Sequence, residues 1–258
     1  MNPNSIHPKS PGSRELVKDK FDTSGSEYDA SRFTCPRFRL LSECYAGLFQ
    51  KLLPEPTEVS AVLEIGAGTG RFTAIILNRG FTVTATDINP GLLETLRDKV
   101  SQAGAADRCR VAVQDMFDLD FADDSFDLVY SINVIPRLLT LEDQRAALLE
   151  IARVIKPGGQ LLFNYRNRRS FYRFIFKGHT ATPDEIGTIL AEANVRIVDR
   201  RGQLLSSMML FRRLPMFLNR LVVKLDLALS HVVSSHAWDI FLLAEKAPEG
   251  SAQEKAQF

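Results

Sequence analysis

From residue 59 to residue 166, short apolar runs alternate with longer segments in which apolar residues recur at helical spacing. Short runs bounded by turn residues are typical of buried strands, and this alternation predicts a parallel sheet with crossover helices. The predicted strands are SAVLEI, FTVTATD, RVAVQD, FDLVYSI and QLLFNYR, and the predicted helices lie near 71–79, 89–103 and 141–155. We expect the last helix to stop at a turn formed by Pro157, Gly158 and Gly159.

Two further segments flank this alternating region. Before it, Pro36 to Leu53 carries apolar residues at helical spacing, which predicts one amphipathic helix closed by Pro54. After it, the pattern predicts a helix from about Pro183, a strand NVRIVDR, a long apolar and basic stretch, and a last strand WDIFLLAEK. The strand and helix units predict an α/β fold with a Rossmann-like sheet.

The composition agrees with an ordinary soluble fold in one enlarged domain. The chain has 258 residues, of which 45% are hydrophobic and 24% charged, which excludes collagen-like and wholly disordered classes. A net charge of +1 gives no global basic field, so no nucleic-acid partner is expected. Residues 1–26 are polar and predict a flexible tail. The domain then covers 27–258, with lid elements expected at 27–54 and 204–235.

Three features that the sequence lacks bear on the expected location of the protein and on its cysteines. The longest uncharged stretch, from Leu227 to Trp238, is well short of the ~20 apolar residues that span a bilayer. The N-terminal segment lacks the apolar core of a secretory signal, so we expect a cytoplasmic protein. The cysteines Cys35, Cys44 and Cys109 have no metal-binding or CxxC spacing. We therefore expect reduced, mostly buried thiols and no metal site.

A glycine-rich loop follows the first predicted strand. AVLEI runs directly into GAGTG at 66–70, where glycine at alternate positions permits a tight turn and a close approach to a ligand. Arg71 stands where a dinucleotide fingerprint has its third glycine, so the NAD-type GxGxxG pattern is not met. A plain structural turn is the alternative interpretation of the loop.

Polar side chains stand at the ends of the strands that follow. Asp87 ends the second predicted strand, seventeen positions beyond Gly70, where a carboxylate can accept hydrogen bonds from a ribose diol. Asp115 ends the third strand, and Asn133 follows the fourth. Turn capping is the alternative role for Asp115 and Asn133. Because open α/β sheets bind ligands at the carboxyl ends of their strands, these features together predict adenosine recognition.

The sequence resembles the class I S-adenosylmethionine-dependent methyltransferases, particularly the branch that modifies small molecules and lipids. Five segments carry the resemblance in the family's order, within roughly 28–246: VLEIGAGTGRF at 62–72, VTATDINPGLL at 83–93, VAVQDMFDL at 111–119, SFDLVYSINVI at 125–135 and RVIKPGGQLLF at 153–163. The resemblance implies S-adenosylmethionine as cofactor. It also implies a seven-stranded, mostly parallel sheet with an antiparallel last strand, helices on both faces and a helical lid.

The resemblance also implies roles for individual residues. Glu64 and the 66–70 backbone would lie beside the methionine portion, Asp87 on the ribose hydroxyls and Asp115 on the adenine amino group. Asn133 would lie near the sulfonium, and the segment EYDASR at 27–32 would close over the cofactor. The expected cofactor contacts are Tyr28, Arg32, Glu64, Gly66, Ala67, Gly68, Gly70, Asp87, Ile88, Asp115, Met116 and Asn133.

No catalytic residue follows from the sequence. Methyl transfer to oxygen is expected, and transfer to nitrogen or carbon less so, with a small or lipophilic acceptor. Many relatives carry a histidine after the fourth strand, but this chain has Pro136 and Arg137 there. His179 and His236 are the histidines whose positions face the expected pocket. Because a sulfonium methyl is already activated, positioning contributes more than a base.

Two basic and apolar stretches bear on the acceptor or on a partner. The stretch 165–177 interleaves arginines with aromatic residues, which suits phosphate and ring contacts or RNA, or else a helix with an aromatic core face. The stretch 204–233 suits a lipophilic pocket or peripheral membrane contact, or else helices that cap the sheet. A non-catalytic cofactor-binding subunit and an NAD-dependent oxidoreductase stay open as alternatives. The oligomeric state is not predicted.

Overall fold

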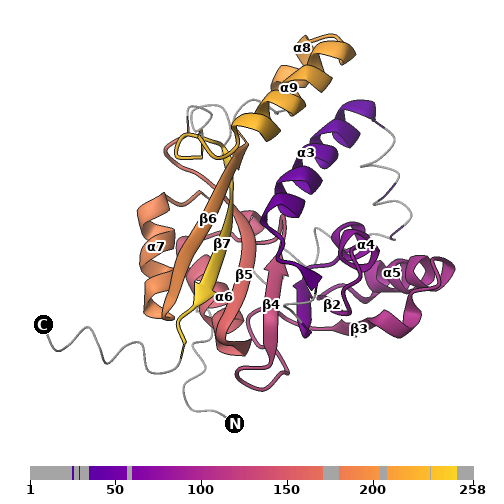
Figure 1. Ribbon diagram of the computed structural model, residues 1–258, viewed down its shortest axis with the longest axis vertical. Coiled ribbons are helices and arrows are strands. Elements are labelled where there is room, and N and C mark those ends of the chain that lie inside the picture. The colour runs from indigo at the N-terminus through magenta and orange to yellow at the C-terminus, as the bar shows by residue number, and fades with distance from the viewer. Residues whose placement is uncertain are drawn as a thin grey trace, which may run out of the picture.

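A seven-stranded sheet forms the centre of the protein (Figure 1). The structure is a computed structural model, and it describes residues 25, 29, 35–56, 60–170, 180–203, 208–232 and 234–248. The strand order is β3-β2-β1-β4-β5-β7-β6, where β7 is antiparallel to β5 and β6 and the pairs from β3 through β5 are parallel. The strands are β1 (Val62–Ile65), β2 (Val83–Asp87), β3 (Cys109–Val113), β4 (Phe126–Ser131), β5 (Ile155–Arg166), β6 (Val195–Gln203) and β7 (Asp239–Lys246). The predicted sheet with its antiparallel last strand is confirmed.

Helices cover both faces of this sheet, as the sequence predicts. One cluster of buried apolar side chains joins α3 (Pro36–Leu52), α4 (Arg71–Asn78) and α5 (Pro90–Gln102) to one face. A second cluster joins α6 (Leu141–Val154) and α7 (Pro183–Glu192) to the other. Side-chain caps mark the starts of three of these helices: Asn89 caps α5, and Thr140 and Thr182 form capping boxes with α6 and α7.

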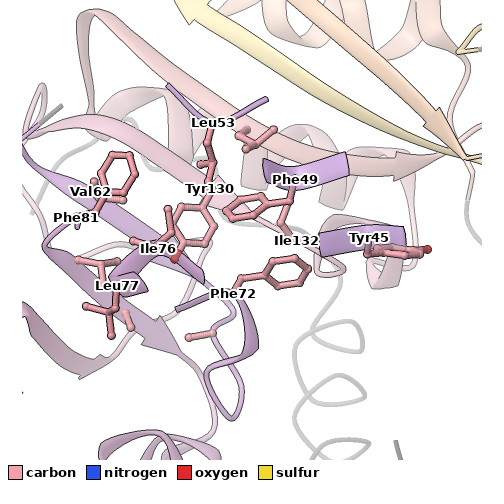
Figure 2. Close-up of a cluster of buried hydrophobic side chains, with 14 of the residues drawn as sticks. Tyr45, Phe49, Leu53, Val62, Phe72, Ile76, Leu77, Phe81, Tyr130 and Ile132 are labelled. Carbon is pink, nitrogen blue, oxygen red and sulfur yellow. The ribbon is translucent and has the colours of Figure 1, made fainter. Parts of the chain in front are cut away.

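Aromatic side chains fix α3 on the sheet beside α4 (Figure 2). Phe49 of α3 meets the edge of Phe72 of α4 with ring centroids 5.0 Å apart, and it lies 5.1 Å from the ring of Tyr130 on β4. Rings in such tilted and edge-on contacts contribute beyond their buried area. The predicted amphipathic helix is therefore part of the core, and its position beside α4 places it next to the glycine loop.

One local expectation is wrong. Pro157, Gly158 and Gly159 do not form a turn between a helix and a strand, because β5 already begins at Ile155 and includes them. The helix α6 ends at Val154 because Ile155 adopts an extended conformation and pairs with Phe126 of β4. The ladder then shifts register between Phe126 and Leu128, so the segment is the bulged start of a strand.

The stretch between β6 and β7 forms two helices, α8 (Met208–Arg213) and α9 (Met216–Leu229), which pack against α3 and extend beyond the ends of the strands (Figure 1). The side chain of Arg37 on α3 donates to the carbonyl of Phe211 at 2.6 Å, and Asn219 of α9 donates to the same carbonyl at 3.0 Å. No helix in the described part of the chain is long and apolar enough to cross a membrane.

Candidate functional site

A pocket lies at the carboxyl ends of β1, β2 and β4, the edge where the sequence predicts a ligand. Its lining comes from the glycine loop, the ends of β2 and β3, and the segment after β4. The lining residues are Ile65, Gly66, Ala67, Gly68, Thr69, Arg71, Phe72, Asp87, Ile88, Leu92, Gln114, Asp115, Met116, Phe117, Ile132, Asn133, Val134, Arg137 and Leu138. Eight of the predicted cofactor residues are among them: Gly66, Ala67, Gly68, Asp87, Ile88, Asp115, Met116 and Asn133.

The three loop glycines serve different purposes. All three have positive φ, at 75° for Gly66, 57° for Gly68 and 89° for Gly70. This backbone conformation is energetically unfavourable for residues that carry a Cβ atom. A Cβ at Gly66 would come within 2.2 Å of a Val134 methyl, and one at Gly70 within 2.3 Å of a Leu96 methyl. A Cβ at Gly68 would meet nothing within 4 Å. Gly66 and Gly70 therefore permit close packing, whereas Gly68 keeps space free on the pocket side.

Asp87 joins the glycine loop to the end of β2. Its carboxylate accepts a hydrogen bond from the Gly68 amide at 2.8 Å and another from the Asn89 amide at 2.9 Å. Burial raises the pKa of this carboxyl, and these amide donors oppose the rise. Each carboxylate oxygen has a further lone pair, so Asp87 can order the loop and still accept from a ligand hydroxyl.

Glu64 does not line the pocket. Its side chain lies on the sheet face covered by α4 and accepts hydrogen bonds from the hydroxyls of Thr73, at 2.5 Å, and Tyr130, at 2.8 Å. Burial raises the pKa of this carboxyl to about 7, although both hydroxyl donors favour the charged form. The geometry makes Glu64 a support beneath the loop, and its direct contact with the cofactor stays a prediction.

Asp115 and Asn133 both line the pocket and also shape the backbone. The Asp115 carboxylate accepts from the Phe117 amide at 3.0 Å, so the turn-capping alternative and the pocket position hold together. Asn133 has a φ of 65°, which is uncommon outside glycine and often marks functional sites. Its amide donates to the Asn164 side chain at 2.6 Å, and its carbonyl accepts from Arg137 at 2.7 Å.

Tyr28 and Arg32 lie outside the described residues, so their contacts stay predictions. Asp29, between them in the sequence, is described and contacts the glycine loop. Its carboxylate accepts from the Thr69 hydroxyl at 2.6 Å and forms an ion pair with Lys99 at 2.5 Å. This residue of the predicted closing segment therefore reaches the loop.

Several lining residues were missed by the sequence reasoning. In the sequence, Arg71 stands out only as a departure from the NAD fingerprint, yet it lines the pocket, donates to Ser42 of α3 at 2.7 Å and stacks over the Phe72 ring at 4.2 Å. Arg137, noted only as replacing a histidine, also lines the pocket. Arg71 directly follows the glycine loop, and Arg137 comes shortly after Asn133. Their closeness in the sequence to predicted site residues could have indicated both. The other lining residues that the sequence does not indicate are Ile65, Phe72, Leu92, Gln114, Phe117, Ile132, Val134 and Leu138, whereas Thr69 belongs to the predicted 66–70 loop.

The remaining candidates lie elsewhere or outside the described chain. His179 is not described, and His236, which shares a hydrogen bond of 2.9 Å with Ser235, does not line the pocket. In the basic stretch 165–177, the residues after 170 are not described. Arg168 and Arg169 form ion pairs with Glu185 and Asp184. The cysteines are free thiols, two of them buried, and the described residues hold no cluster of three metal-ligating side chains.

Comparison with known proteins defines the class. Residues 63–163 match the model of a family described as "Methyltransferase domain". This stretch contains the glycine loop, Asp87, Asp115 and Asn133, which form much of the pocket. The chain therefore carries a class I S-adenosylmethionine-dependent methyltransferase domain, and the predicted class, fold and cofactor are confirmed at the level of this domain.

Individual relatives agree with this class. Methyltransferase GfsG of Streptomyces halstedii is 35% identical over 113 residues, which is 42% of this chain and 40% of the relative. A malonyl-[acyl-carrier protein] O-methyltransferase of Halorhodospira halophila is 34% identical over 152 residues, or 58% of this chain and 48% of the relative. The chain thus spans less than half the length of these two relatives. The magnesium protoporphyrin IX methyltransferase of Synechocystis, at 12% identity, shares the fold with a TM-score of 0.67 over 91% of this chain and 100% of that one.

Proposed function

We propose that this protein binds S-adenosylmethionine in the pocket and transfers the methyl group to an oxygen atom of a small or lipophilic acceptor. The observation that carries the proposal is the combination at the ends of β1 and β2: Gly68 leaves free space, and the partly buried Asp87 presents its carboxylate at the same point. A carboxylate so placed suits a ribose diol, and a side-chain-free loop suits the methionine part. Asp115 and Asn133, further along the same lining, are proposed to contact the adenine and the sulfonium regions.

The chemistry needs alignment more than proton transfer. In the transfer, the acceptor oxygen forms a bond to the methyl carbon while the bond from that carbon to sulfur breaks, and S-adenosylhomocysteine leaves. Holding the two reactants in line can remove about 7 to 11 kcal/mol of the barrier. The strained backbone of Asn133, fixed by Asn164 and Arg137, supplies a rigid wall for such alignment.

The pocket lining also bears on the acceptor. Among the described lining residues there is no His, Lys, Glu or Tyr, and the two carboxylates present are assigned above to the cofactor. This favours an acceptor oxygen that is already ionised near neutral pH, such as a carboxylate or an acidic hydroxyl, because such an oxygen needs no base. That the relative from Halorhodospira halophila is named as an O-methyltransferase supports oxygen as the acceptor atom.

Transfer from carbon-13-labelled S-adenosylmethionine to a panel of carboxylic acids, phenols, alcohols and amines tests the proposal. We expect labelled methyl on oxygen, and the chemical shift of the product distinguishes O-, N- and C-methyl groups. For a series of acids, the pH profile should follow the pKa of the acceptor. Cofactor binding without transfer to any acceptor would favour a non-catalytic subunit instead.

A further inference from the structure

An apolar stripe runs along the outer face of α9. Phe217, Leu221, Leu225 and Leu229 follow one another at intervals of four residues, so they lie on one side of the helix. Their exposed fractions are 70%, 50%, 42% and 44%, and Val232, just beyond the helix, is 78% exposed. Single exposed apolar residues are common on protein surfaces, but a continuous row of this kind marks an interaction surface.

Positive charge borders this stripe without an exposed negative partner. Arg220 and Lys224 lie on the same helix, and Arg212 and Arg213 end α8, and all four are exposed. None of them forms an ion pair with a carboxylate in the described part of the chain. The acidic residue between 208 and 232 is Asp226, which is buried. The face therefore combines apolar side chains with uncompensated positive charge.

The opposite side of α9 is fixed on α3. Val223 and Asp226 are buried, and Leu227 packs so close to Gly47 of α3 that a Cβ there would come within 2.8 Å of it. Lys51 of α3 also donates to the carbonyl of Leu227. One side of α9 is thus packed in the core, and the stripe on the other side is exposed in the folded protein without any rearrangement.

We propose that the outer face of α9 docks this protein on the surface of an anionic lipid membrane. In this arrangement the helix lies in the plane of the interface, with Phe217, Leu221 and Leu225 among the lipid chains. The cations of α8 and α9 contact lipid phosphates, as in amphipathic helices with a basic border. Charge complementarity favours an anionic bilayer as the occupant, because residues 208–232 carry four exposed cations while their acidic residue, Asp226, is buried.

The helix α3 connects α9 to the pocket lining. The helix α3 packs against α9 on one side, and its residue Ser42 accepts a hydrogen bond from Arg71 of the pocket lining. A lipophilic acceptor in the membrane would then have a short path to the cofactor, a consequence that rests on the proposed function. The docking itself does not rest on it.

Sedimentation of the full-length protein with lipid vesicles tests the proposal. We expect binding to vesicles that contain phosphatidylglycerol, weaker binding to phosphatidylcholine alone, and a decrease with added salt. The variant Arg220→Glu/Lys224→Glu should bind the anionic vesicles at least about 25-fold more weakly, since each such cation contributes about fivefold. The control Arg97→Glu/Arg110→Glu reverses two exposed cations on α5 and β3, at the other end of the sheet, and should bind normally (Figure 1).

A second pair of variants tests the apolar stripe. Leu221→Ser/Leu225→Ser should weaken vesicle binding by about 100-fold, because each lost side chain contributes about tenfold. The matched control is Val198→Ser/Ile197→Ser on the edge strand β6, where the exposed fractions are the same, 50% and 42%. Thermal melting checks that all variants fold, and calorimetry with S-adenosylmethionine should give one affinity for all of them, which separates docking from cofactor binding.

Three results would overturn the proposal. The first is no vesicle binding by the wild-type protein. The second is equal binding to neutral and anionic vesicles, or equal losses in the α9 variants and their controls. The third is a dimer in solution that Leu221→Ser/Leu225→Ser dissociates while vesicles do not bind, which would make the stripe a contact between two copies of the chain.

Discussion

The glycine loop and the outer face of α9 arrange polar and apolar groups in opposite ways. At the loop, the polar groups turn inward and have partners: Asp87 accepts from Gly68 and Asn89, and Asp29 accepts from Thr69. On α9, the apolar side chains turn outward and the cations beside them have no described carboxylate partner. The loop is therefore a preformed site for a small ligand, whereas the α9 face is a surface for the proposed contact with a lipid membrane.

The largest expected effect separates two glycines of the same loop. Gly68→Val should abolish S-adenosylmethionine binding in a folded protein, because the branched side chain enters free pocket space and resists a positive φ. Gly66→Val should instead lower the melting temperature strongly, since its Cβ would overlap the Val134 side chain. Calorimetry and thermal melting of both variants check this difference. Retained binding by a folded Gly68→Val protein would mean that the loop is only a turn.

The next effect concerns the carboxyl beneath the loop. Burial raises the pKa of Glu64 from 4.5 to about 7, so the folded protein keeps a proton that the unfolded chain releases. The stability from this group is fully present below pH 4.5 and is lost as the pH rises to about 7, a loss of about 3 kcal/mol. Glu64→Gln should remove this part of the pH dependence. Urea unfolding at several pH values measures it, and parallel curves for the two proteins would contradict the assignment.

A smaller effect contrasts the two sides of α9. Val223→Ala should lower the free energy of unfolding by about 2 kcal/mol, because Val223 is buried against the core. Leu221→Ala, two positions earlier, should change it by no more than about 0.5 kcal/mol, because Leu221 is exposed. Chemical denaturation compares the two. Equal losses would show that the stripe is part of the core.

The smallest of these effects is on the ribose contact. Asp87→Ala should weaken S-adenosylmethionine binding by at least about 1.5 kcal/mol, the contribution of a hydrogen bond to a charged group. It should also destabilise the loop, since the amides of Gly68 and Asn89 lose their acceptor. Calorimetry at a temperature where the variant is fully folded separates the two effects. An unchanged dissociation constant would remove Asp87 from the proposed role.

Apart from β5, α8 and α9, the bounds of the strands and of the main helices could be predicted from the sequence to within about three residues, because their signals are local. Thr140 and Thr182 mark helix starts through capping boxes, and the apolar runs mark the strands. The bulged start of β5 could not be predicted, because it depends on the pairing of Ile155 with Phe126 in a distant strand. The apolar run marks the regular part of the strand, but it does not show where a bulge adds unpaired residues to the ladder.

Some features of the candidate site could likewise be predicted from the sequence, and others could not. The pocket positions of Asp87, Gly66 and Gly68 could be predicted, since the ends of parallel strands share one edge of the sheet. Gly70 does not line the pocket, and its contact with the cofactor stays a prediction. Glu64 lies outside the pocket lining because side chains alternate along a strand, and its contacts with Thr73 and Tyr130 depend on the three-dimensional packing. Arg137 reaches the pocket through the turn at Asn133, whose positive φ no sequence pattern indicates.

Binding of S-adenosylmethionine in the pocket at the ends of β1 and β2 underlies the proposed function. Isothermal titration of the full-length protein with S-adenosylmethionine, and separately with NADH, tests it most directly. We expect saturable binding of one S-adenosylmethionine per chain, competed by S-adenosylhomocysteine, and no heat of binding with NADH. Binding of NADH without binding of S-adenosylmethionine would contradict it.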